Sequence, residues 1–328
     1  MAYETEDQET QYCFPDINSS CVKEKISKHQ NNIMYVFFSL LSAWTVFLNL
    51  LVIISISHFK KLHTPTNMII LSLAVADLLV GLIVMPVEAI RLIETCWYFG
   101  HTFCGLFMII MGLLGSTSLS NLVLIAVDRY VAVCHPLLYP QKITTTKTLM
   151  TICLCWFCAS AYNTALSGSN GHFDTLNETA VCYGECSVII SFTWKVVDLF
   201  VSLLFPCTLI ITLYLRIFCV VHQQVKVINS LMKGSKSESK AALTLGIIVA
   251  VHVLCWLPLY IIALAGNTTM AYRIVNILTW VFYMNSGLNP LIHALFYPWF
   301  RRSVRHMLSL KIFQPASSLV DIFTNDNL

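Results

Sequence analysis

The side chains of this sequence that could do chemistry are a few ionisable groups set in long apolar runs. Asp77 and Asp198 lie inside such runs, and Asp128 stands next to Arg129 at the end of another. Burying a carboxylate without a partner is costly, so each of these acids marks a candidate functional position. A buried carboxylate can hold a metal cation, an organic cation or a basic side chain.

Asp77 shares its depth in the apolar runs with several other polar residues. These are Asn49, Ser118, Asn285, Ser286 and Asn289. Together they could form one hydrogen-bonded cluster, in which Asp77 is neutral or binds a small cation such as Na⁺. The alternative is a contact that only joins helices, as polar side chains in membrane proteins often do. No other metal and no organic cofactor is expected.

Asp128, Arg129 and Tyr130 end one run, where an acid–base pair could simply anchor the chain at an interface. Glu238, at the start of a later run, offers Arg129 a second carboxylate. An ion pair between Arg129 and Glu238 would clamp the ends of two helices. Its rupture would open a cavity for a partner protein, so the pattern also predicts a switch.

Seven long apolar runs must position these groups. The 328 residues are 57% hydrophobic and 11% charged, whereas soluble domains carry about 25% charged residues. Lipid must therefore be the solvent for much of the chain, and a net charge of +3 gives no reason to expect nucleic acid as a partner. Each run can cross a hydrocarbon core of about 30 Å as a helix. The sequence thus predicts an all-α membrane protein, a seven-transmembrane helix bundle, with runs over 33–58, 68–92, 102–133, 149–167, 190–222, 240–265 and 272–297.

Basic residues and glycosylation sequons indicate the orientation of the bundle. Most Lys and Arg flank the runs on the side opposite the N-terminus, and basic loops stay in the cytoplasm. The sequons at Asn18, Asn177 and Asn267 fall on the other side, so glycosylation is expected outside, at Asn18 and Asn177. We therefore expect a plasma-membrane protein with four parts. They are an extracellular tail (1–32), a transmembrane domain (33–297), an amphipathic helix on the inner membrane surface (298–310) and a cytoplasmic tail (311–328).

Thirteen cysteines divide into two groups by their surroundings. Those in or beside apolar runs act as small hydrophobic side chains. Cys13, Cys21, Cys104, Cys182 and Cys186 lie in or next to polar segments, where disulfides could form in an oxidising compartment. Cys96 fits either group.

Seven motifs occur in order, one in each run. They are Asn49, the Leu-Ala-Val-Ala-Asp run ending at Asp77, Asp128-Arg129-Tyr130, Trp156, Pro206 with Tyr214, Cys255-Trp256-Leu257-Pro258 and Asn289-Pro290. The pattern resembles the rhodopsin-like (class A) G-protein-coupled receptors across essentially the whole chain. The resemblance implies that Arg129 and Tyr214 face a heterotrimeric G protein and that Trp256 is the switch beneath the ligand pocket. It also favours Na⁺ at Asp77 and implies a disulfide between Cys104 and Cys186. The other switch residues would be Asp128, Tyr130, Glu238, Asn289, Pro290 and His293.

A narrower resemblance is to the trace amine-associated receptors, of the olfactory type. It is carried by the segment from Asn285 to Phe300, by Trp97-Tyr98-Phe99-Gly100, and by Cys182-x3-Cys186. In that family the additional loop cysteine pairs with one in the N-terminal tail, which implies Cys21 for Cys182, with Cys13 as the alternative. The family mostly senses protonated amines, and it implies a stimulatory or olfactory G protein that raises cyclic AMP.

The usual amine counter-ion of such receptors is missing here. It lies five helical turns from the Arg of the Asp-Arg-Tyr motif, about 18 residues or about 27 Å, and that position is Met111. Asp198, eight residues before Pro206, is the expected substitute, and Gly112 and Gly115 would leave room across the pocket. The other predicted lining residues are Ser202, Trp256, Leu259, Tyr260 and Tyr283.

Two alternatives to this amine site remain open. Lys195 lies three residues before Asp198, close enough on a helix for an ion pair, and the ligand would then be a small molecule that is not an amine. A diamine would need a second acid, for which Glu88 is a weak candidate. His252 and His293 replace the usual Phe and Tyr of the switch region, and neutral hydrogen bonding is favoured over a pH-sensitive role.

Functions of other classes find little support. The sequence has no His-Glu-x-x-His motif, phosphate-binding loop or Ser/His/Asp set, so we do not expect an enzyme. The run from Tyr272 to Tyr297 has no Lys that could bind retinal, which argues against a light-driven pump. The two halves lack the self-similarity expected of a transporter.

Overall fold

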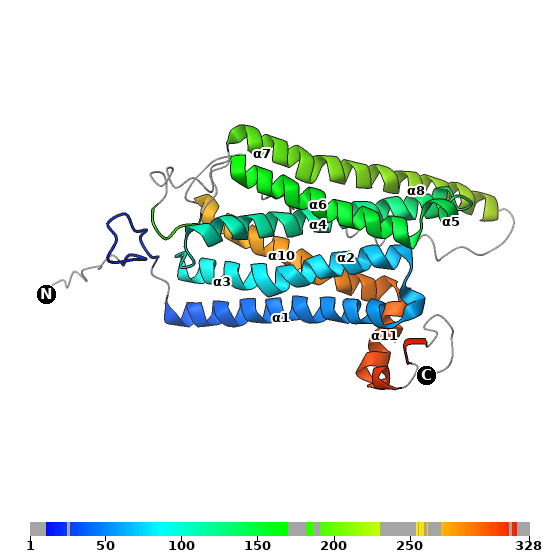
Figure 1. The fold of residues 1–328 in the computed structure, drawn as a ribbon, viewed down its shortest axis with the longest axis horizontal. Coiled ribbons are helices and arrows are strands. Elements are labelled where there is room, and N and C mark those ends of the chain that lie inside the picture. Colours follow the sequence, from blue (N-terminus) through cyan, green and yellow to red (C-terminus); the bar gives the residue numbers. More distant parts are fainter. Residues whose placement is uncertain are drawn as a thin grey trace.

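A computed structural model describes residues 11–24, 27–169, 182–186, 191–229, 254, 256–258, 261, 270–314 and 317–319. In these ranges the chain is built of helices, and the long ones run along the long axis of the molecule (Figure 1). Some of the residues for which the sequence predicts a role lie outside the described residues. They are Asn177, Glu238, His252, Cys255, Leu259, Tyr260 and Asn267.

Five helical segments of the described part are long and apolar enough to cross a membrane. They are Lys28–His58, Pro65–Glu94, His101–Cys134, Thr145–Gly168 and Phe192–Gln223. In order, they comprise α1 (Lys28–His58), α2 (Pro65–Leu79) with α3 (Met85–Glu94), α4 (His101–Cys134), α6 (Thr145–Ser169), and α7 (Phe192–Leu199) with α8 (Phe205–Asn229). The other described helices are α5 (Tyr139–Lys142), α10 (Met270–Phe296) and α11 (Pro298–Leu308), with 3₁₀ turns at Lys60–Leu62, Lys311–Phe313 and Ser317–Leu319.

The first two helices begin before the apolar runs that predicted them. The Ser27 hydroxyl accepts a hydrogen bond from the backbone N–H of Gln30 at the start of α1. The Thr64 hydroxyl caps α2 in the same way, and Pro65 follows it as the first helical residue. Such caps satisfy the free N–H groups of a first turn, so a helix can extend into polar sequence that a hydropathy pattern excludes.

The central helix of the bundle is α4, which contacts α2, α6 and α8. Two buried apolar clusters surround it. One includes Ile70, Leu122 and Ile125 and lies toward the half of the bundle that holds Arg129. The other includes Met85, Phe107 and Trp280 and lies toward the N-terminal tail. These halves are called the Arg129 end and the tail end below.

Two of the described transmembrane segments contain a π-helical turn. Val80–Val84 (η2) joins α2 to α3, and Phe200–Leu204 (η4) joins α7 to α8. A π turn adds one residue to the helix, which rotates everything beyond it by about 100° relative to a continuous α-helix. The direction of the side chains in α3 and α7 therefore depends on these turns.

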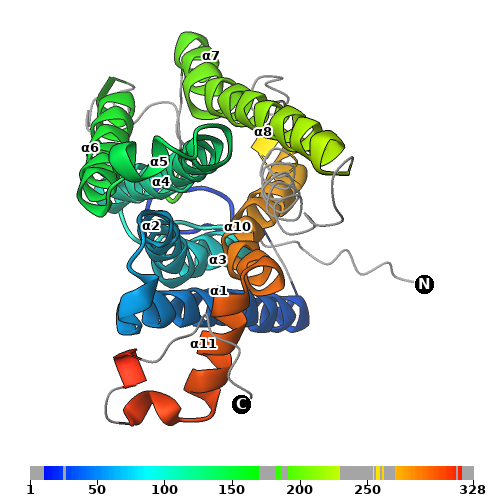
Figure 2. The ribbon, with the colours of Figure 1, turned by 90° about the vertical axis from the view of Figure 1, so that its right-hand side faces the viewer.

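After α10 the chain turns sharply into α11, which crosses beneath α1 (Figure 2). Trp299 and Phe300 are buried, and the ring of His306 packs edge-on against Phe59 at 5.6 Å. Arg301 and Arg305 are exposed on the other face. This amphipathic arrangement is that of a helix lying on a membrane surface.

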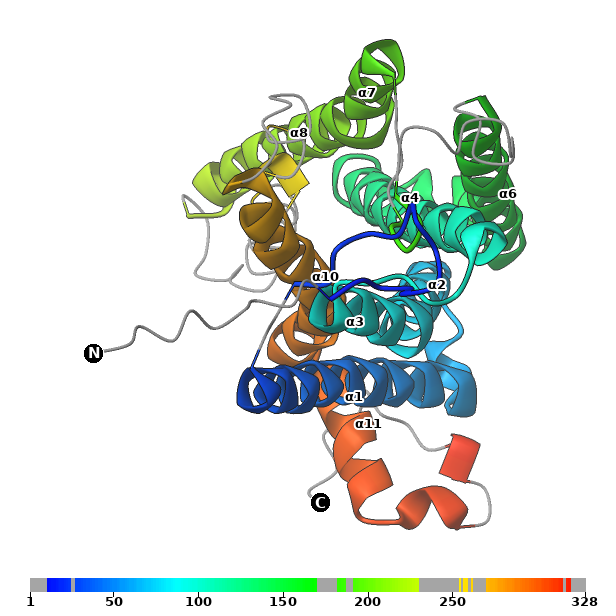
Figure 3. The same ribbon diagram turned by 90° about the vertical axis from the view of Figure 1, so that its left-hand side faces the viewer.

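The N-terminal tail arches over the other end of the bundle (Figure 3). Tyr12 and Val22 form an antiparallel bridge, so that residues 11–24 make a closed loop. Three disulfides link this region: Cys13–Cys96, Cys21–Cys182 and Cys104–Cys186. The tail thus connects the loop between α3 and α4 to the loop that precedes α7. The last two pairings are those that the family resemblance implied, whereas Cys13–Cys96 was not expected.

Candidate functional site

Asp198 lies in α7 and is held by two hydroxyl groups. The Tyr162 hydroxyl, from α6, donates to Oδ1 of Asp198 at 2.9 Å. The Ser202 hydroxyl, one turn further along the same segment, donates to the same oxygen at 2.7 Å. The carboxylate is half-buried. Hydroxyl donors are neutral, so these two hydrogen bonds orient the carboxylate without compensating its charge.

The π turn of Phe200–Leu204 determines where Asp198 points relative to Pro206. Counted along a continuous α-helix, eight residues place Asp198 about 80° away from Pro206. The extra residue of the π turn moves Asp198 by about 100°, to nearly the same side. A count along the sequence therefore predicts the depth of this carboxylate in the helix but not the direction it faces.

Met111 contacts the last transmembrane helix. The hydroxyl of Tyr283, a buried residue of α10, donates to the Met111 sulfur at 3.1 Å. The position at which the family resemblance implies an acid therefore faces the bundle interior. A thioether fills it and accepts a weak hydrogen bond, so this wall of the interior has no negative charge at that point.

Gly112 and Gly115 allow side chains of neighbouring helices to come close. A Cβ on Gly112 would lie 2.1 Å from Oδ1 of Asn163, and one on Gly115 would lie 3.2 Å from the ring of Trp256. The Asn163 amide donates to the Ser116 hydroxyl at 3.1 Å. The room that these glycines were expected to leave for a ligand is therefore taken up by Asn163 and Trp256. Trp256 also packs edge-on against Phe282, with ring centroids 4.5 Å apart.

Glu88 differs from Asp198 in its partner. Its carboxylate is buried, with a side-chain exposure of 4%, and Arg91 of the same helix binds both of its oxygens. Nε of Arg91 donates to Oε2 at 3.0 Å. A bidentate guanidinium both satisfies and neutralises the acid. This weak candidate for a second amine contact is thus already paired within its own helix.

Asp77 is the centre of a buried polar cluster, as the sequence predicted. Ser118 donates to Oδ1 at 3.2 Å, and the Asn289 amide donates to Oδ2 at 2.7 Å. The Asn49 amide donates to the backbone carbonyl of Ser286 at 3.0 Å. Among the described residues, Oδ1 of Asn49 and Oδ1 of Asn289 are buried acceptors without a donor. Asn285 is also buried.

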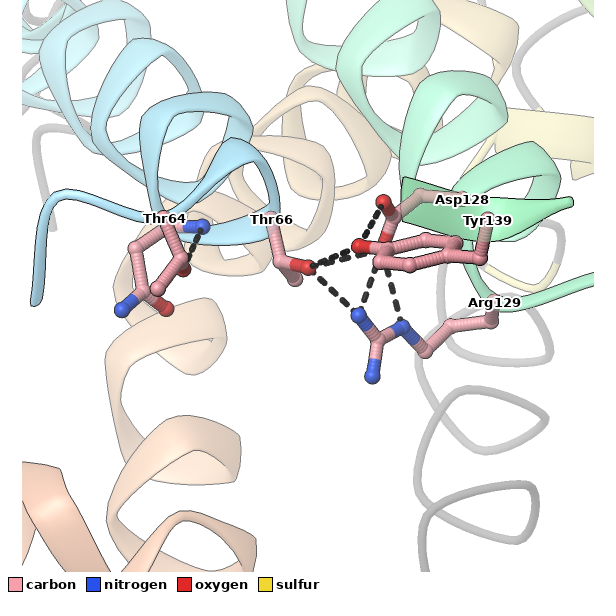
Figure 4. A network of polar contacts seen from close by, with 6 residues as sticks. Thr64, Thr66, Asp128, Arg129 and Tyr139 are labelled. Atoms are coloured by element: carbon pink, nitrogen blue, oxygen red, sulfur yellow. Dashed lines mark hydrogen bonds and ion pairs between the residues drawn. The ribbon is translucent and has the colours of Figure 1, made fainter. Parts of the chain in front are cut away.

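At the Arg129 end, Asp128 accepts hydrogen bonds from three side chains (Figure 4). Thr66 donates at 2.8 Å, Tyr139 at 2.9 Å and Nε of Arg129 at 3.0 Å. Arg129 also donates to the Thr66 hydroxyl. The network ties the ends of α2, α4 and α5 together. Burial raises the pKa of the Tyr139 phenol, so it remains a proton donor at neutral pH.

Other predicted switch residues lie near this network. Tyr214 is half-buried, and its hydroxyl has no hydrogen-bond partner in the described part of the chain. Tyr130 packs edge-on against His135, at 5.6 Å. Pro290 lies inside α10, which also contains His293, whose side chain lies outside the described part of the structure.

Sequence reasoning missed Thr66, Tyr139, Tyr162 and the Cys13–Cys96 disulfide. For the Cys13–Cys96 disulfide, the positions of the cysteines in the sequence could have indicated the pairing. Once Cys21–Cys182 and Cys104–Cys186 are paired, Cys13 and Cys96 are the remaining cysteines near the polar tail and loops. For the hydroxyl residues no spacing rule applies, because their partners are on other helices.

Comparison with known proteins places this architecture in a family. The sequence model of the family described as 7 transmembrane receptor (rhodopsin family) matches residues 48–293 of this chain. The chain is 39% identical over 330 residues to trace amine-associated receptor 13c of Danio rerio, covering 96% of this chain and 97% of that protein. It is 40% identical over 335 residues to trace amine-associated receptor 6 of Rattus norvegicus, covering 96% of each.

Trace amine-associated receptor 8a of Rattus norvegicus is 39% identical over 335 residues, covering 96% of this chain and 97% of the relative. These matches extend over nearly the full length of each protein, so they include the tail, the bundle and α11. They confirm the seven-helix fold class predicted from the apolar runs. The chain therefore belongs to the trace amine-associated receptors, within the rhodopsin family of seven-transmembrane receptors.

Proposed function

We propose that this receptor binds a small protonated amine at the tail end of the bundle, with Asp198 as the counter-ion. The single observation that carries the proposal is the arrangement of this carboxylate. It is half-buried in a transmembrane segment, and hydroxyls of Tyr162 and Ser202 fix its orientation. The names of the curated relatives, which associate them with trace amines, support the same ligand class.

Family membership defines the broad setting of this site. The chain is a multi-pass receptor of the plasma membrane rather than an enzyme, and its partners are a small-molecule ligand and a heterotrimeric G protein. Beyond this, we place the tail end outside the cell and the Arg129 end inside. Exposed Arg301 and Arg305 on α11 support this orientation, and the exposed Asn18 in the tail loop is the expected glycosylation site.

The proposed ligand pocket lies in the tail-end half of the bundle, between α7 on one side and α4 with α10 on the other. Asp198 and Ser202 form one side, and Met111 and Tyr283 meet on the other. Trp256 forms the floor. Leu259 and Tyr260, which the sequence also predicts to contact the ligand, lie outside the described residues. Aromatic faces attract organic cations, so an ammonium group gains from this lining as well as from the carboxylate.

Transmission depends on the Arg129 end. Asp128 and Thr66 bind the guanidinium of Arg129, and Tyr139 binds Asp128 in turn, which engages Arg129 within the receptor. Activation releases Arg129 and lets it contact a stimulatory or olfactory G protein, which raises cyclic AMP. Glu238 would add a second carboxylate to the inactive clamp.

The Asp77 cluster is suited to Na⁺. Hard cations prefer oxygen ligands, and the cluster offers a carboxylate, the Ser118 hydroxyl and two amide oxygens that lack donors. Bound Na⁺ would compensate the buried charge of Asp77 and hold α2, α4 and α10 together. Because Na⁺ would stabilise the inactive arrangement, raising its concentration should lower the potency of agonists.

A cyclic-AMP reporter assay tests the amine proposal. Hexylamine and its uncharged analogue hexanol are applied to cells that express the wild-type receptor, Asp198→Asn or Asp198→Glu, with surface expression measured in parallel. We expect hexylamine alone to activate, Asp198→Asn to lose at least a hundredfold in potency, and Asp198→Glu to retain part of it. The competing proposal is a ligand that is not an amine, with Asp198 paired to Lys195 and Met111 in place of the usual acid. Equal hexylamine potency of wild type and Asp198→Asn would exclude Asp198 as the counter-ion, and activation by hexanol but not by hexylamine would support the alternative.

A further inference from the structure

The π turn between α2 and α3 leaves a backbone carbonyl without a donor in its own helix. In an α-helix the carbonyl of Gly81 would accept from the N–H of Met85, but in the π turn that N–H donates to Val80 instead. The next N–H along the chain would belong to Pro86, and proline has none. The helix itself therefore cannot satisfy the carbonyl of Gly81, which is a buried residue.

The hydroxyl of Ser42, on α1, supplies the missing donor. It donates to the carbonyl of Gly81 at 2.6 Å, across 39 positions in the sequence. The helices can come this close because residue 81 has no side chain. A Cβ there would lie 3.0 Å from Cγ2 of Val46 and 3.2 Å from Cγ2 of Thr45. A carbonyl without a donor is costly inside a membrane protein, so the hydroxyl offsets the main cost of the π turn.

Proline explains why the helix widens at this point. In a regular α-helix its ring clashes with the carbonyl of the residue four positions earlier, and a wider turn relieves that clash. The other described π turn, Phe200–Leu204, also ends two residues before a proline, Pro206, and the N–H of Phe205 donates to Phe200 there. The common register indicates a common cause. Proline thus creates the need for a donor, and in η2 Ser42 meets it.

The direction of α3 depends on this turn. A continuous helix would rotate α3 by about 100° relative to α2. In the observed orientation Glu94 faces α1 and the tail, since the Tyr35 hydroxyl donates to its Oε1 at 2.8 Å and Nζ of Lys23 binds its Oε2 at 2.8 Å. The backbone N–H of Glu24 also donates to the Thr95 hydroxyl at 3.1 Å. These contacts between the tail loop and the bundle therefore follow from the π turn.

We propose that Ser42 is a positioning residue for the tail end of the receptor. By supplying the donor that Gly81 lacks, it holds the π turn and so directs Glu94 toward Lys23. Its effect reaches the tail through the backbone of η2 and α3. A residue that only fills space would stabilise the bundle as a whole, whereas Ser42 should act first on α3 and the tail loop. This role does not depend on which ligand the receptor binds.

Removing the hydroxyl and restoring a backbone donor test this role. Ser42→Ala deletes the donor to Gly81, and Pro86→Ala returns an N–H to residue 86. With that N–H present, the Gly81 carbonyl has a backbone donor whether the segment keeps its π turn or closes into an α-helix. The matched control is Ser55→Ala, because Ser55 lies in the same helix as Ser42 and its hydroxyl donates to Leu51 of that helix at 2.7 Å. Thermal unfolding and backbone hydrogen exchange are measured on the full-length receptor in nanodiscs.

Ser42→Ala should lower Tm by about 2–8 °C, because a buried acceptor loses its donor. Backbone exchange should rise in α3 and in residues 11–24 but not in α4. In the Pro86→Ala background the same change should lower Tm by less than about 1 °C, and Ser55→Ala should match the wild type.

Three results would overturn the proposal. They are an unchanged Tm in Ser42→Ala, an equal loss of Tm in both backgrounds, and exchange that rises in α4 as much as in α3 and the tail loop. If Ser42→Ala alone does not reach the cell surface, the double variant decides. Recovered surface expression in Ser42→Ala with Pro86→Ala would support the proposal, and continued loss would exclude it.

Discussion

Two acids of the tail end, Glu88 and Asp198, lie on opposite sides of the bundle, and their surroundings differ in kind. Glu88 is buried, and Arg91 of the same helix binds both of its carboxylate oxygens. The two side chains together form a neutral ion pair. Asp198 is half-buried and bound at one oxygen by the hydroxyls of two other residues. Both acids are satisfied as hydrogen-bond acceptors, but the hydroxyl partners of Asp198 carry no charge.

The difference teaches how a membrane protein separates a structural acid from a binding acid. A guanidinium removes the negative charge and so removes the attraction for a second cation. Hydroxyl donors stabilise and orient the carboxylate but leave its charge, and a cationic ligand can complete the compensation. In the proposed pocket, the side formed by α3, α4 and α10 is therefore the neutral one, and Asp198 on α7 is the acid offered to a cationic ligand.

Neutralising each acid in turn should produce opposite results. Glu88→Gln leaves Arg91 without its carboxylate, which should lower the free energy of unfolding by about 2–3 kcal/mol, while amine EC50 changes less than about threefold. Asp198→Asn should lose at least about a hundredfold in potency and keep its stability. Thermal unfolding of the purified receptor and the cyclic-AMP assay measure the two effects. A large loss of potency in stable Glu88→Gln receptor would show that both walls bind the ligand.

Moving the charge from one wall to the other should restore part of the response. Met111→Asp puts a carboxylate beside the Tyr283 hydroxyl, which already donates at that position. In the Asp198→Asn background we expect this second change to recover at least about tenfold in hexylamine potency, since an ammonium–carboxylate contact of low exposure is worth more than that factor. The control is Met111→Asn in the same background, which has a similar shape but no charge. Equal recovery in both would exclude a charge effect.

The contact between α6 and α4 at Asn163 should be sensitive to small steric changes. Gly112→Ala places a methyl group 2.1 Å from the Asn163 amide oxygen, so the amide must move, which disturbs its hydrogen bond from α6 to Ser116 of α4. We expect amine EC50 to rise about three- to tenfold, measured against Gly168→Ala, where an added Cβ meets no atom within 4 Å. Wild-type potency in Gly112→Ala would mean that the spacing of the walls does not control the site.

Removing the lysine near Asp198 should have the smallest effect. Lys195→Met keeps an unbranched side chain but deletes the charge, and intrahelical ion pairs at this spacing contribute only a few tenths of a kcal/mol. Amine EC50 should therefore stay within about threefold of the wild type, with a slight gain if Lys195 competes for the carboxylate. A gain of tenfold or more would identify Lys195 as the partner of Asp198 in the resting receptor.

Much of the bundle could be predicted from the sequence, because few backbone structures can satisfy all their hydrogen bonds in lipid. An apolar run long enough to cross a bilayer must be a helix, and the motifs assign the runs to the rhodopsin family. Along straight helices the count also predicts side-chain direction, so Met111 faces the interior next to Tyr283. The Asp77 cluster was predictable for the same reason, since its members share one depth.

The tertiary structure alone decided what each polar group contacts. Tyr162, Thr66 and Tyr139 donate to acids on other segments, and no spacing rule links residues of different helices. The π turn after Asp198 rotates that carboxylate by about 100°, which no residue pattern announces. Hydropathy thus determined the helices and their depth, because lipid contact is a property of each residue alone. Helix packing determined the charge of each wall, because compensation depends on which side chains meet.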